Sequence, residues 1–221
     1  MRILAISDIH GAYEFAKRIA QTEAGIDVLV IAGDMTTNGT RTEATDAIDE
    51  LRVLVPRILA VAGNMDTPEI EMGYEDYGVS ISGRGVCIGD VAFFGVSGCP
   101  FSPLQTPFEM SEEDVLALAE KGWQQVAQCK CKIFVPHAPP YGTALDVIRN
   151  GRHVGSTAVR KFVEKRQPNL LICGHIHESP GVDTLGQTRM LNCGAVHDGR
   201  YAIVEIGKDI LLYQKELGES I

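Results

Sequence analysis

The chain has 221 residues, of which 45% are hydrophobic and 22% charged, so it is long enough to bury its own core and has the composition of a globular protein. Its formal net charge of −9 disfavours binding to an extended nucleic acid, although a small nucleotide substrate is still allowed because bound cations would change the local field. The first residues, MRILAISDIHG, are interrupted by Asp8 and His10 and therefore form neither a signal peptide nor a membrane span. We expect a cytoplasmic protein with no membrane partner.

The first third of the chain alternates between strand and helix patterns. Apolar runs predict strands at 2–7, 26–33 and 57–63. Amphipathic patterns predict helices at 12–24 and 41–54. This β-α-β-α-β order is typical of a sheet with crossover helices.

The remainder mixes hairpins, strands and two further helices. Residues 79–98 predict antiparallel hairpins, since strand-like runs are separated by Gly83-Arg84-Gly85 and Gly89-Asp90. Helices are predicted to start at Ser111 and at Ser156 or Thr157, the second running through Arg166. Strands are predicted within 131–140, 169–177, 188–194 and 201–214. With no repeat, linker or low-complexity tract, we expect one mixed α/β domain over residues 1–221.

Six cysteines are scattered along the chain without a C-x-x-C pair, which disfavours a redox or zinc motif. We interpret them as small buried apolar side chains in a reducing compartment, which predicts free thiols.

Polar side chains follow five of the predicted strands, each at the point where the strand ends. They are Asp8 and His10, Asp34, Asn64, His137, and His175 with His177. The carboxyl ends of strands in open α/β sheets form a ligand crevice, so we expect these side chains to converge. In extended chain, the i, i+2 spacing of Asp8 with His10 and of His175 with His177 would place each pair on one face. One histidine alone is more often structural, but this set favours a metal site.

Five sequence blocks, in this order, resemble the signature blocks of the calcineurin-like metallophosphoesterases. They are SDIHG (7–11), AGDM (32–35), AGNMD (62–66), VPHAPP (135–140) and CGHIH (173–177), and NCG (192–194) fits the strand that follows. The compact pattern is similar to the small prokaryotic phosphodiesterase branch, which also includes the retromer scaffold subunit. The resemblance implies a four-layer αββα sandwich, with two mixed sheets packed face to face and helices outside.

The resemblance also implies a ligand set for two metal ions. Asp8, His10, Asp34 and His177 would hold the first ion, and Asp34, Asn64, His137 and His175 the second. Two cations about 3.5–4 Å apart repel each other, so Asp34 would supply the anionic oxygen between them. Donors from His, Asp and Asn without Cys favour divalent transition metals, with Mn²⁺ as the leading candidate and Ni²⁺, Fe, Co²⁺ or Zn²⁺ as alternatives.

The predicted reaction is hydrolysis of a small phosphodiester by a metal-bridging hydroxide, with Asp34, Asn64 and His137 as the catalytic residues. Asn64 would add an oxygen ligand without another charge and would tolerate strained backbone at the corner after its strand. Asp66 either orients the histidines or is a surface acid.

Met65 is where this sequence departs from the family pattern. Many members carry histidine at this position, in "GNHD" or "GNHE", and that histidine is thought to contact phosphate and protonate the leaving group. A thioether can do neither, so we expect phosphodiesters with good leaving groups to be favoured over alkyl phosphomonoesters. The alternative is that Met65 fills an apolar gap.

The segment 146–166 is basic within an acidic chain. Arg149, Arg152 and His153 are therefore candidates for gripping substrate phosphate, although a solvated loop explains them equally well. His197 is not assigned a role, because its glycine-rich setting is also that of a turn.

The alternative functions are a phosphomonoesterase or protein phosphatase of the same family, or a non-catalytic metal-binding scaffold like the retromer subunit. A homo-oligomer is possible.

Overall fold

The apolar runs of the first third form the parallel part of one five-stranded sheet. The computed structural model describes residues 1–218. The strand order in this sheet is β13 (Ile210–Glu216), β12 (Arg200–Ile206), β1 (Arg2–Ile6), β2 (Val28–Ala32) and β3 (Ile58–Val61). β1, β2 and β3 are parallel, and the β12–β13 hairpin is added antiparallel to β1. Every residue of β2 and β3 is buried, as expected for strands covered on both faces.

The second sheet has six strands and comes from the rest of the chain. Their order is β10 (Gly181–Leu185), β11 (Thr188–Asn192), β9 (Leu170–Cys173), β8 (Cys131–Pro136), β5 (Val91–Val96) and β4 (Gly85–Ile88). The four central strands are parallel, and the two edge strands are antiparallel to their neighbours. A separate two-stranded ribbon joins β6 (Cys99–Pro100) to β7 (Glu109–Met110).

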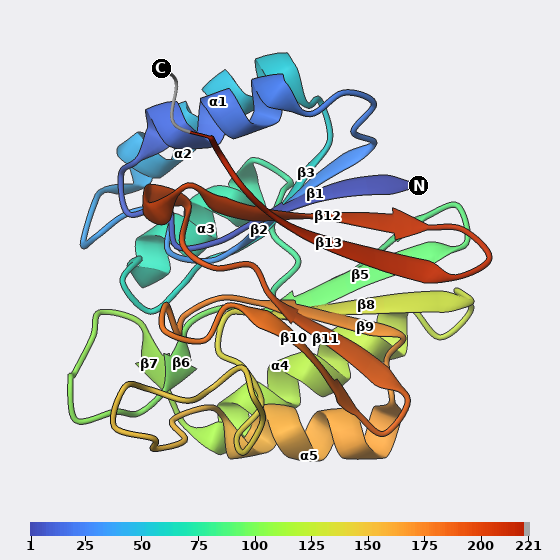
Figure 1. Ribbon diagram of the computed structural model, residues 1–221. Coiled ribbons are helices and arrows are strands. Elements are labelled where there is room, and N and C mark those ends of the chain that lie inside the picture. The colour runs from blue at the N-terminus through green and yellow to red at the C-terminus, as the bar shows by residue number, and fades with distance from the viewer. Residues whose placement is uncertain (219–221) are drawn as a thin grey trace.

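Within the described residues 1–218, five helices cover the outer faces of the two sheets (Figure 1). They are α1 (Tyr13–Thr22), α2 (Arg41–Leu54), α3 (Pro68–Asp76), α4 (Glu112–Gln125) and α5 (Thr157–Arg166), with a 3₁₀ turn, η1, at Val196–Asp198. Alternate side chains of β1 point into two different apolar layers, one on each face of the sheet. Leu4 and Ile6 pack under α1, α2 and α3, whereas Ile3 and Ala5 face the second sheet. A third apolar cluster joins the second sheet to α4 and α5, so the predicted αββα sandwich is confirmed.

The predicted helix starts have the expected caps. The Ser111 side chain accepts a hydrogen bond from the Asp114 N–H, and Ser156 accepts one from the Val159 N–H. Ser156, not Thr157, is therefore the N-cap of α5. No helix within residues 1–218 has the length and apolar character needed to cross a bilayer.

The chain between β3 and β5 differs from the prediction. The helix α3 in this part of the chain was not predicted. Later in the chain, the edge strand β10 and the β6–β7 ribbon were not predicted either. Ser80 forms a parallel bridge with Ala60 of β3, and Ser82 forms one with Gly95 of β5. Residues 79–82 therefore connect the two sheets instead of forming an antiparallel hairpin at Gly83. Within residues 79–98, the Gly89-Asp90 turn joins the one antiparallel pair, β4 with β5.

The prediction of six free thiols is wrong for one pair. Cys87 of β4 and Cys129, just after α4, form a disulfide across 42 residues of sequence. The pairing depends on the packing of β4 beside α4, which sequence spacing does not reveal. The remaining cysteines are free thiols, buried at Cys99, Cys173 and Cys193 and partly exposed at Cys131.

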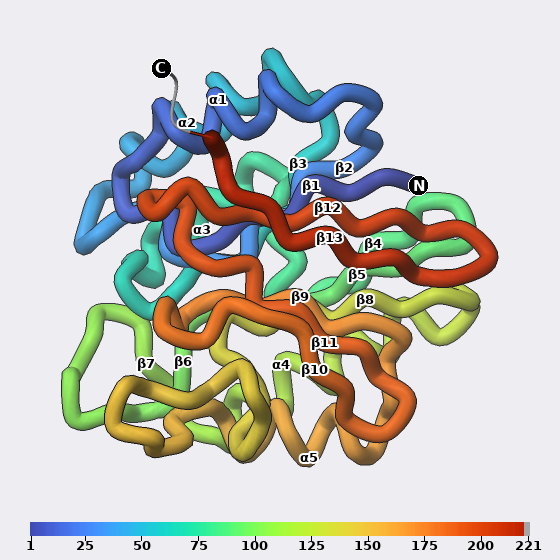
Figure 2. Tube along the Cα trace, viewed as in Figure 1, coloured from blue at the N-terminus to red at the C-terminus, as the bar shows by residue number. Residues whose placement is uncertain are grey.

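The parallel strands of both sheets end on the same side of the molecule. Figure 2 shows the N-terminus on the right, so β1 runs to the left, where the gold connection 137–156 also lies. Backbone hydrogen bonds join the connections at this edge: the Asp8 N–H donates to Gly33, and the Gly174 N–H donates to His137. This edge is the expected place for a ligand crevice.

Candidate metal centre

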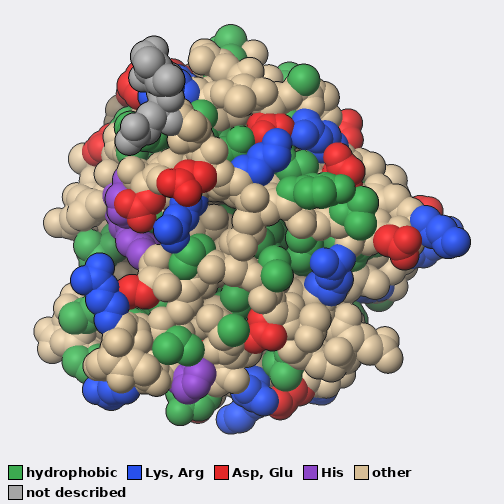
Figure 3. Space-filling view, in the orientation of Figure 1, with side chains coloured by type: hydrophobic (Ala, Val, Ile, Leu, Met, Phe, Trp, Pro, Cys, Tyr) green, Lys and Arg blue, Asp and Glu red, His purple; other side chains and the backbone are tan. Residues whose placement is uncertain are grey.

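Seven polar side chains meet at this edge, in the connections that follow β1, β2, β3, β8 and β9. They are the predicted ligands Asp8, His10, Asp34, Asn64, His137, His175 and His177. Asp8, Asp34, Asn64 and His137 are buried, whereas His10 and His177 are partly exposed and lie toward solvent. On the face drawn in Figure 3, histidine side chains gather on the left, and another lies apart near the bottom.

The backbone at these positions is strained, but not where the sequence suggested. Asp8, His10, Asp34 and His175 have φ values of 55°, 50°, 53° and 70°, in the left-handed region. Asn64 does not, so the prediction of strained backbone at that residue is wrong. The chain is therefore sharply turned at Asp8 and His10, and the extended i, i+2 geometry does not apply. Strain of this kind persists only where the surroundings fix it, and it concentrates at functional sites.

Three glycines allow the connections to pack directly against the polar side chains. A Cβ on Gly33 would lie 2.7 Å from His137 Cγ, and one on Gly63 would lie 2.5 Å from Asp34 Cγ. A Cβ on Gly174 would overlap Ser7 and the Asp8 carboxylate. Each close approach is possible only because the residue is glycine.

The first cluster consists of Asp8, His10 and His177. His177 Nε2 lies 3.2 Å from Asp8 Oδ1 and 3.4 Å from His10 Nε2. His10 Nδ1 is 2.9 Å from Thr37 Oγ1, which directs its Nε2 toward the cluster. The His175 backbone N–H donates to the Asp8 carboxylate and fixes its orientation. One ligand atom from each of the three residues lies within 4.8 Å of the others, a spacing that one divalent ion can bridge.

The second cluster is built around Asn64. Its Oδ1 lies 2.9 Å from His137 Nε2 and 2.7 Å from His175 Nδ1. His137 Nε2 is in turn 3.4 Å from Asp34 Oδ2. Asp8, Asp34 and His137 also offer ligand atoms within 4.8 Å of one another, so the two clusters adjoin.

Asp34 stands between the clusters. Its Oδ1 accepts a hydrogen bond of 2.7 Å from the Met65 backbone N–H. Its Oδ2 lies 3.7 Å from His10 Nε2 on one side and 3.4 Å from His137 Nε2 on the other. One oxygen is thus held by the protein, and the other faces both histidines. A carboxylate oxygen in this position can be shared by two cations.

The donor set around His137 fits a cation. His137 Nδ1 lies 2.7 Å from the Ala32 carbonyl, which can only accept, so Nδ1 carries the proton. In the neutral ring, the lone pair of Nε2 then faces two other acceptors, Asn64 Oδ1 and Asp34 Oδ2. Burial is the largest single effect and lowers the pKa of His137, but the negative charges of Asp34 and Asp8 and the hydrogen bonds to Asp34 and the Ala32 carbonyl together outweigh it and raise the pKa to about 9. Positive charge is therefore favoured at this point.

Asp66 is fully buried and supports the backbone of the centre. Its carboxylate accepts hydrogen bonds from the backbone N–H groups of Met35, Thr36 and Gly63 and from the Thr36 hydroxyl. These bonds tie the connection after β2 to the connection after β3. Asp66 is thus neither a surface acid nor a partner of the histidines. Burial and the nearby charge of Asp34 raise the pKa of Asp66 to about 6.

The residues expected to grip phosphate are placed differently from one another. Arg149 lines an open groove together with His177 and His197. His153 Nδ1 is instead 2.7 Å from the buried Asp146, and Arg152 is exposed on the same loop. These three assignments remain predictions.

His197, which the sequence left open, lies beside the first cluster. Its ring centroid is 5.7 Å from that of His10 and 5.2 Å from that of His177. The glycine-rich turn is also present, since η1 begins at Val196 and Gly199 follows in the left-handed region. Only the tertiary structure reveals that this turn borders the centre.

Comparisons with known proteins agree with this arrangement. Residues 1–179 match the family described as calcineurin-like phosphoesterase, whose members depend on two metal ions. The uncharacterized protein MJ1162 of Methanocaldococcus jannaschii is 35% identical over 196 residues, 87% of each chain. The solved structure of TT1561 from Thermus thermophilus has a TM-score of 0.77 at 16% identity, covering 97% of this chain and 98% of the other. Purple acid phosphatase PPD1 from yellow lupin (Lupinus luteus) has a TM-score of 0.65 at 13% identity, covering 98% of this chain and 51% of its own. At these identities the two structures show a shared fold alone.

Proposed function

The chain belongs to the calcineurin-like phosphoesterase family, and we propose that within it the protein hydrolyses small phosphodiesters with two divalent ions, Mn²⁺ first among them. The observation that carries the proposal is the position of Asp34 Oδ2 between His10 and His137. The clusters on either side of this oxygen would each hold one ion. When bound, the ions would supply positive charge for the phosphate oxygens and a water of lowered pKa.

The residues of the chain have separate tasks in this proposal. Asp8, His10 and His177 would hold one ion, and Asn64, His137 and His175 the other, with Asp34 shared. The Met65 N–H and the His175 N–H keep the two carboxylates in place, so little reorganisation is needed when substrate binds. Asn64 contributes an oxygen without a charge, which limits the negative charge that would repel a phosphate.

The preference for diesters rests on Met65. Its backbone N–H holds Asp34, but its half-exposed thioether has no proton to donate to a leaving alcohol. General-acid catalysis is typically worth about 10²- to 10⁴-fold, and alkyl monoesters with poor leaving groups need it most. Diesters with acidic leaving groups need it least and are the better substrates for this centre.

The experiment compares Met65→His with Met65→Leu and the unmodified protein, all loaded with Mn²⁺. The substrates are bis-p-nitrophenyl phosphate and an alkyl phosphomonoester. We expect Met65→His to raise the monoester-to-diester ratio of kcat/KM by at least about tenfold, within the range of an added acid. Met65→Leu controls for gap filling and should keep the original ratio. An unchanged ratio in Met65→His would show that the missing acid does not set the preference.

A second experiment separates an enzyme from a metal-binding scaffold. We expect the Mn²⁺-loaded protein to hydrolyse bis-p-nitrophenyl phosphate and Asp34→Asn to lose most of this activity, because a neutral amide cannot balance two cations. If the unmodified protein binds metal but hydrolyses neither ester, the scaffold alternative is correct. If it prefers the monoester, the phosphatase alternative is correct.

A further inference from the structure

An open groove of about 590 Å³ borders the exposed side of the first cluster. It is lined by Arg149, His177, Glu178, His197, Asp198 and Arg200. Its volume is within the range of small-molecule sites, roughly 300–1,000 Å³. Because His177 belongs to both the groove and the first cluster, a substrate whose phosphate lies at the metal centre would extend one of its alcohols into this groove.

Two guanidinium groups in the groove are uncommitted. Arg149 and Arg200 form no ion pair or side-chain hydrogen bond with any residue in the described range 1–218. Most other arginines of the chain have a partner, for example Arg160 with Glu164 and Arg166 with Glu120, whereas Arg57 and Arg152, also unpaired within the described residues, do not line this groove. An arginine that keeps its fork of N–H donors free at a groove is available for bidentate binding of an oxyanion.

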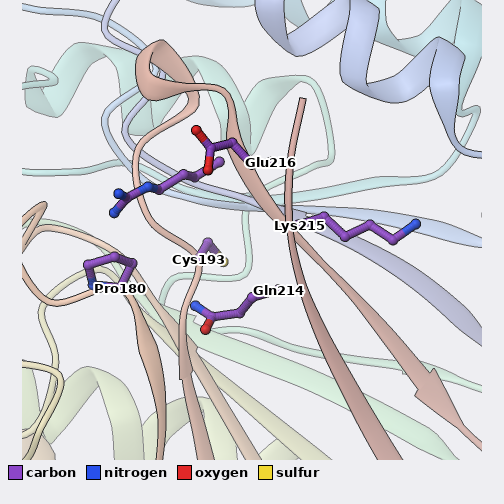
Figure 4. A pocket seen from close by; sticks show the side chains of 6 residues that line it. Pro180, Cys193, Gln214, Lys215 and Glu216 are labelled. Atoms are coloured by element: carbon purple, nitrogen blue, oxygen red, sulfur yellow. The ribbon is translucent and has the colours of Figure 1, made fainter. Parts of the chain in front are cut away.

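Gly194 leaves the space in which the side chain of Arg200 lies. Gly194 has a φ of 74°, and a Cβ at that position would lie 2.9 Å from Arg200 Cδ and 3.1 Å from Pro180 Cβ. The arginine stem therefore crosses a position that only glycine leaves open. Arg200 is also shared with a second pocket, lined by Pro180, Cys193 and Gln214 among others (Figure 4), so it stands between two hollows of the surface.

The acidic residues of the groove limit where an anion can lie. Asp198 Oδ1 is 3.5 Å from His197 Nε2, so this carboxylate is already associated with an imidazole. Glu178 is exposed and would repel an anion that came close to it. An oxyanion in this groove would therefore be bound by the arginine side chains, while the two carboxylates are able to accept hydrogen bonds from hydroxyl groups of the same ligand.

We propose that Arg149 and Arg200 bind a second phosphate group of the substrate in this groove. The preferred substrate is then a phosphodiester in which one of the two alcohols also bears a phosphate monoester. Two guanidinium forks can donate hydrogen bonds to all three terminal oxygens of such a monoester, whereas one fork is enough for the two oxygens of a carboxylate. The inference deepens the proposed phosphodiesterase function and rests on it.

The test uses two chromogenic diesters that differ only in the second phosphate. They are thymidine 5′-(p-nitrophenyl phosphate) and the same compound with a 3′-phosphate. We expect the Mn²⁺-loaded protein to prefer the second compound in kcat/KM by about 10- to 100-fold, the range for hydrogen bonds to charged groups. Arg149→Gln and Arg200→Gln should each reduce this ratio, and the double variant should bring it near one.

Arg57→Gln is the matched control. Arg57 is exposed and precedes β3, at the opposite end of the strand from Asn64, so both its activity and its ratio should equal those of the unmodified protein. Calorimetry adds a readout that needs no turnover: thymidine 3′,5′-bisphosphate should bind more tightly than thymidine 5′-phosphate, and the double variant should lose the difference.

The outcomes separate the two claims. A ratio near one in the unmodified protein, or a preference that survives in the double variant, overturns the second phosphate site while leaving the phosphodiesterase intact. If bis-p-nitrophenyl phosphate and both thymidine diesters are not hydrolysed, the proposed function fails. In that case calorimetry alone tests the second phosphate site: tighter binding of the bisphosphate, lost in the double variant, supports it, and equal binding overturns it.

Discussion

Gly63→Ala is expected to disable the centre without adding or removing any polar group. The new Cβ would lie 2.5 Å from Asp34 Cγ and would also overlap the Asp34 backbone nitrogen. The carboxylate oxygen Oδ1 is nearer still, at 2.0 Å, and an ordinary contact begins near 3.4 Å, so this oxygen must move by 1.4 Å, the difference between the two distances. A misplacement of about 1 Å in a catalytic constellation can cost about 10²-fold in rate, and overpacking typically costs about 1–3 kcal/mol of stability.

The assay is kcat/KM for bis-p-nitrophenyl phosphate with saturating Mn²⁺, together with the free energy of unfolding in urea. Gly207→Ala is the control, because Gly207 lies in the β12–β13 turn, where the atom nearest to a new Cβ is 4.0 Å away. We expect a loss of about 100-fold in Gly63→Ala and little change in Gly207→Ala. Activity of Gly63→Ala within about threefold of the unmodified protein would show that Asp34 does not need to keep its position.

Three further predictions concern residues outside the metal ligands. Burial raises the pKa of Glu109, but hydrogen bonds from the N–H and hydroxyl groups of Ser102 and Thr106 outweigh it and lower the pKa to about 2. A carboxylate whose pKa is lowered by folding stabilises the fold at pH values above its pKa in the unfolded chain, about 4.3. The free energy of unfolding lost in Glu109→Gln, measured in urea, should therefore be largest at neutral pH and shrink as the pH falls from about 4.3 toward 2. A loss that does not depend on pH would contradict this. Asp66→Asn should lower stability by about 2–3 kcal/mol and weaken Mn²⁺ binding, since an amide nitrogen cannot accept the N–H bonds that the carboxylate accepts; equal metal affinity would argue against its supporting role. Cys87→Ser should lower the free energy of unfolding by about 2–4 kcal/mol and abolish any effect of dithiothreitol, whereas a dithiothreitol effect that persists would place the disulfide elsewhere.

The sequence was most informative where periodicity and order carry the information. The strand-helix alternation of the first third is confirmed, and α2 spans the predicted residues 41–54. Buried parallel strands leave continuous apolar runs, and polar residues directly after such runs are conspicuous. The convergence of Asp8, Asp34 and Asn64 follows from strand direction, because parallel strands of one sheet end at one edge. His137 joins them because the second sheet packs with its parallel strands ending on the same side.

The helix α3 was missed although its signal is local. The segment after Thr67 has Pro68 at the first helical position followed by acidic residues, which is typical of a helix start.

Other features depend on contacts that no local pattern encodes. The Cys87–Cys129 disulfide and the position of His197 beside His10 join residues distant in sequence. The left-handed backbone at Asp8 and Asp34 likewise occurs where glycines of other connections, Gly174 and Gly63, pack against these residues.

Anomalous diffraction at the manganese edge, from crystals of the protein equilibrated with Mn²⁺, would show whether two ions share Asp34. We expect two peaks about 3.5–4 Å apart on either side of Asp34 Oδ2, one near Asp8, His10 and His177 and one near Asn64, His137 and His175. A single peak, or two peaks that do not share Asp34, would contradict this expectation.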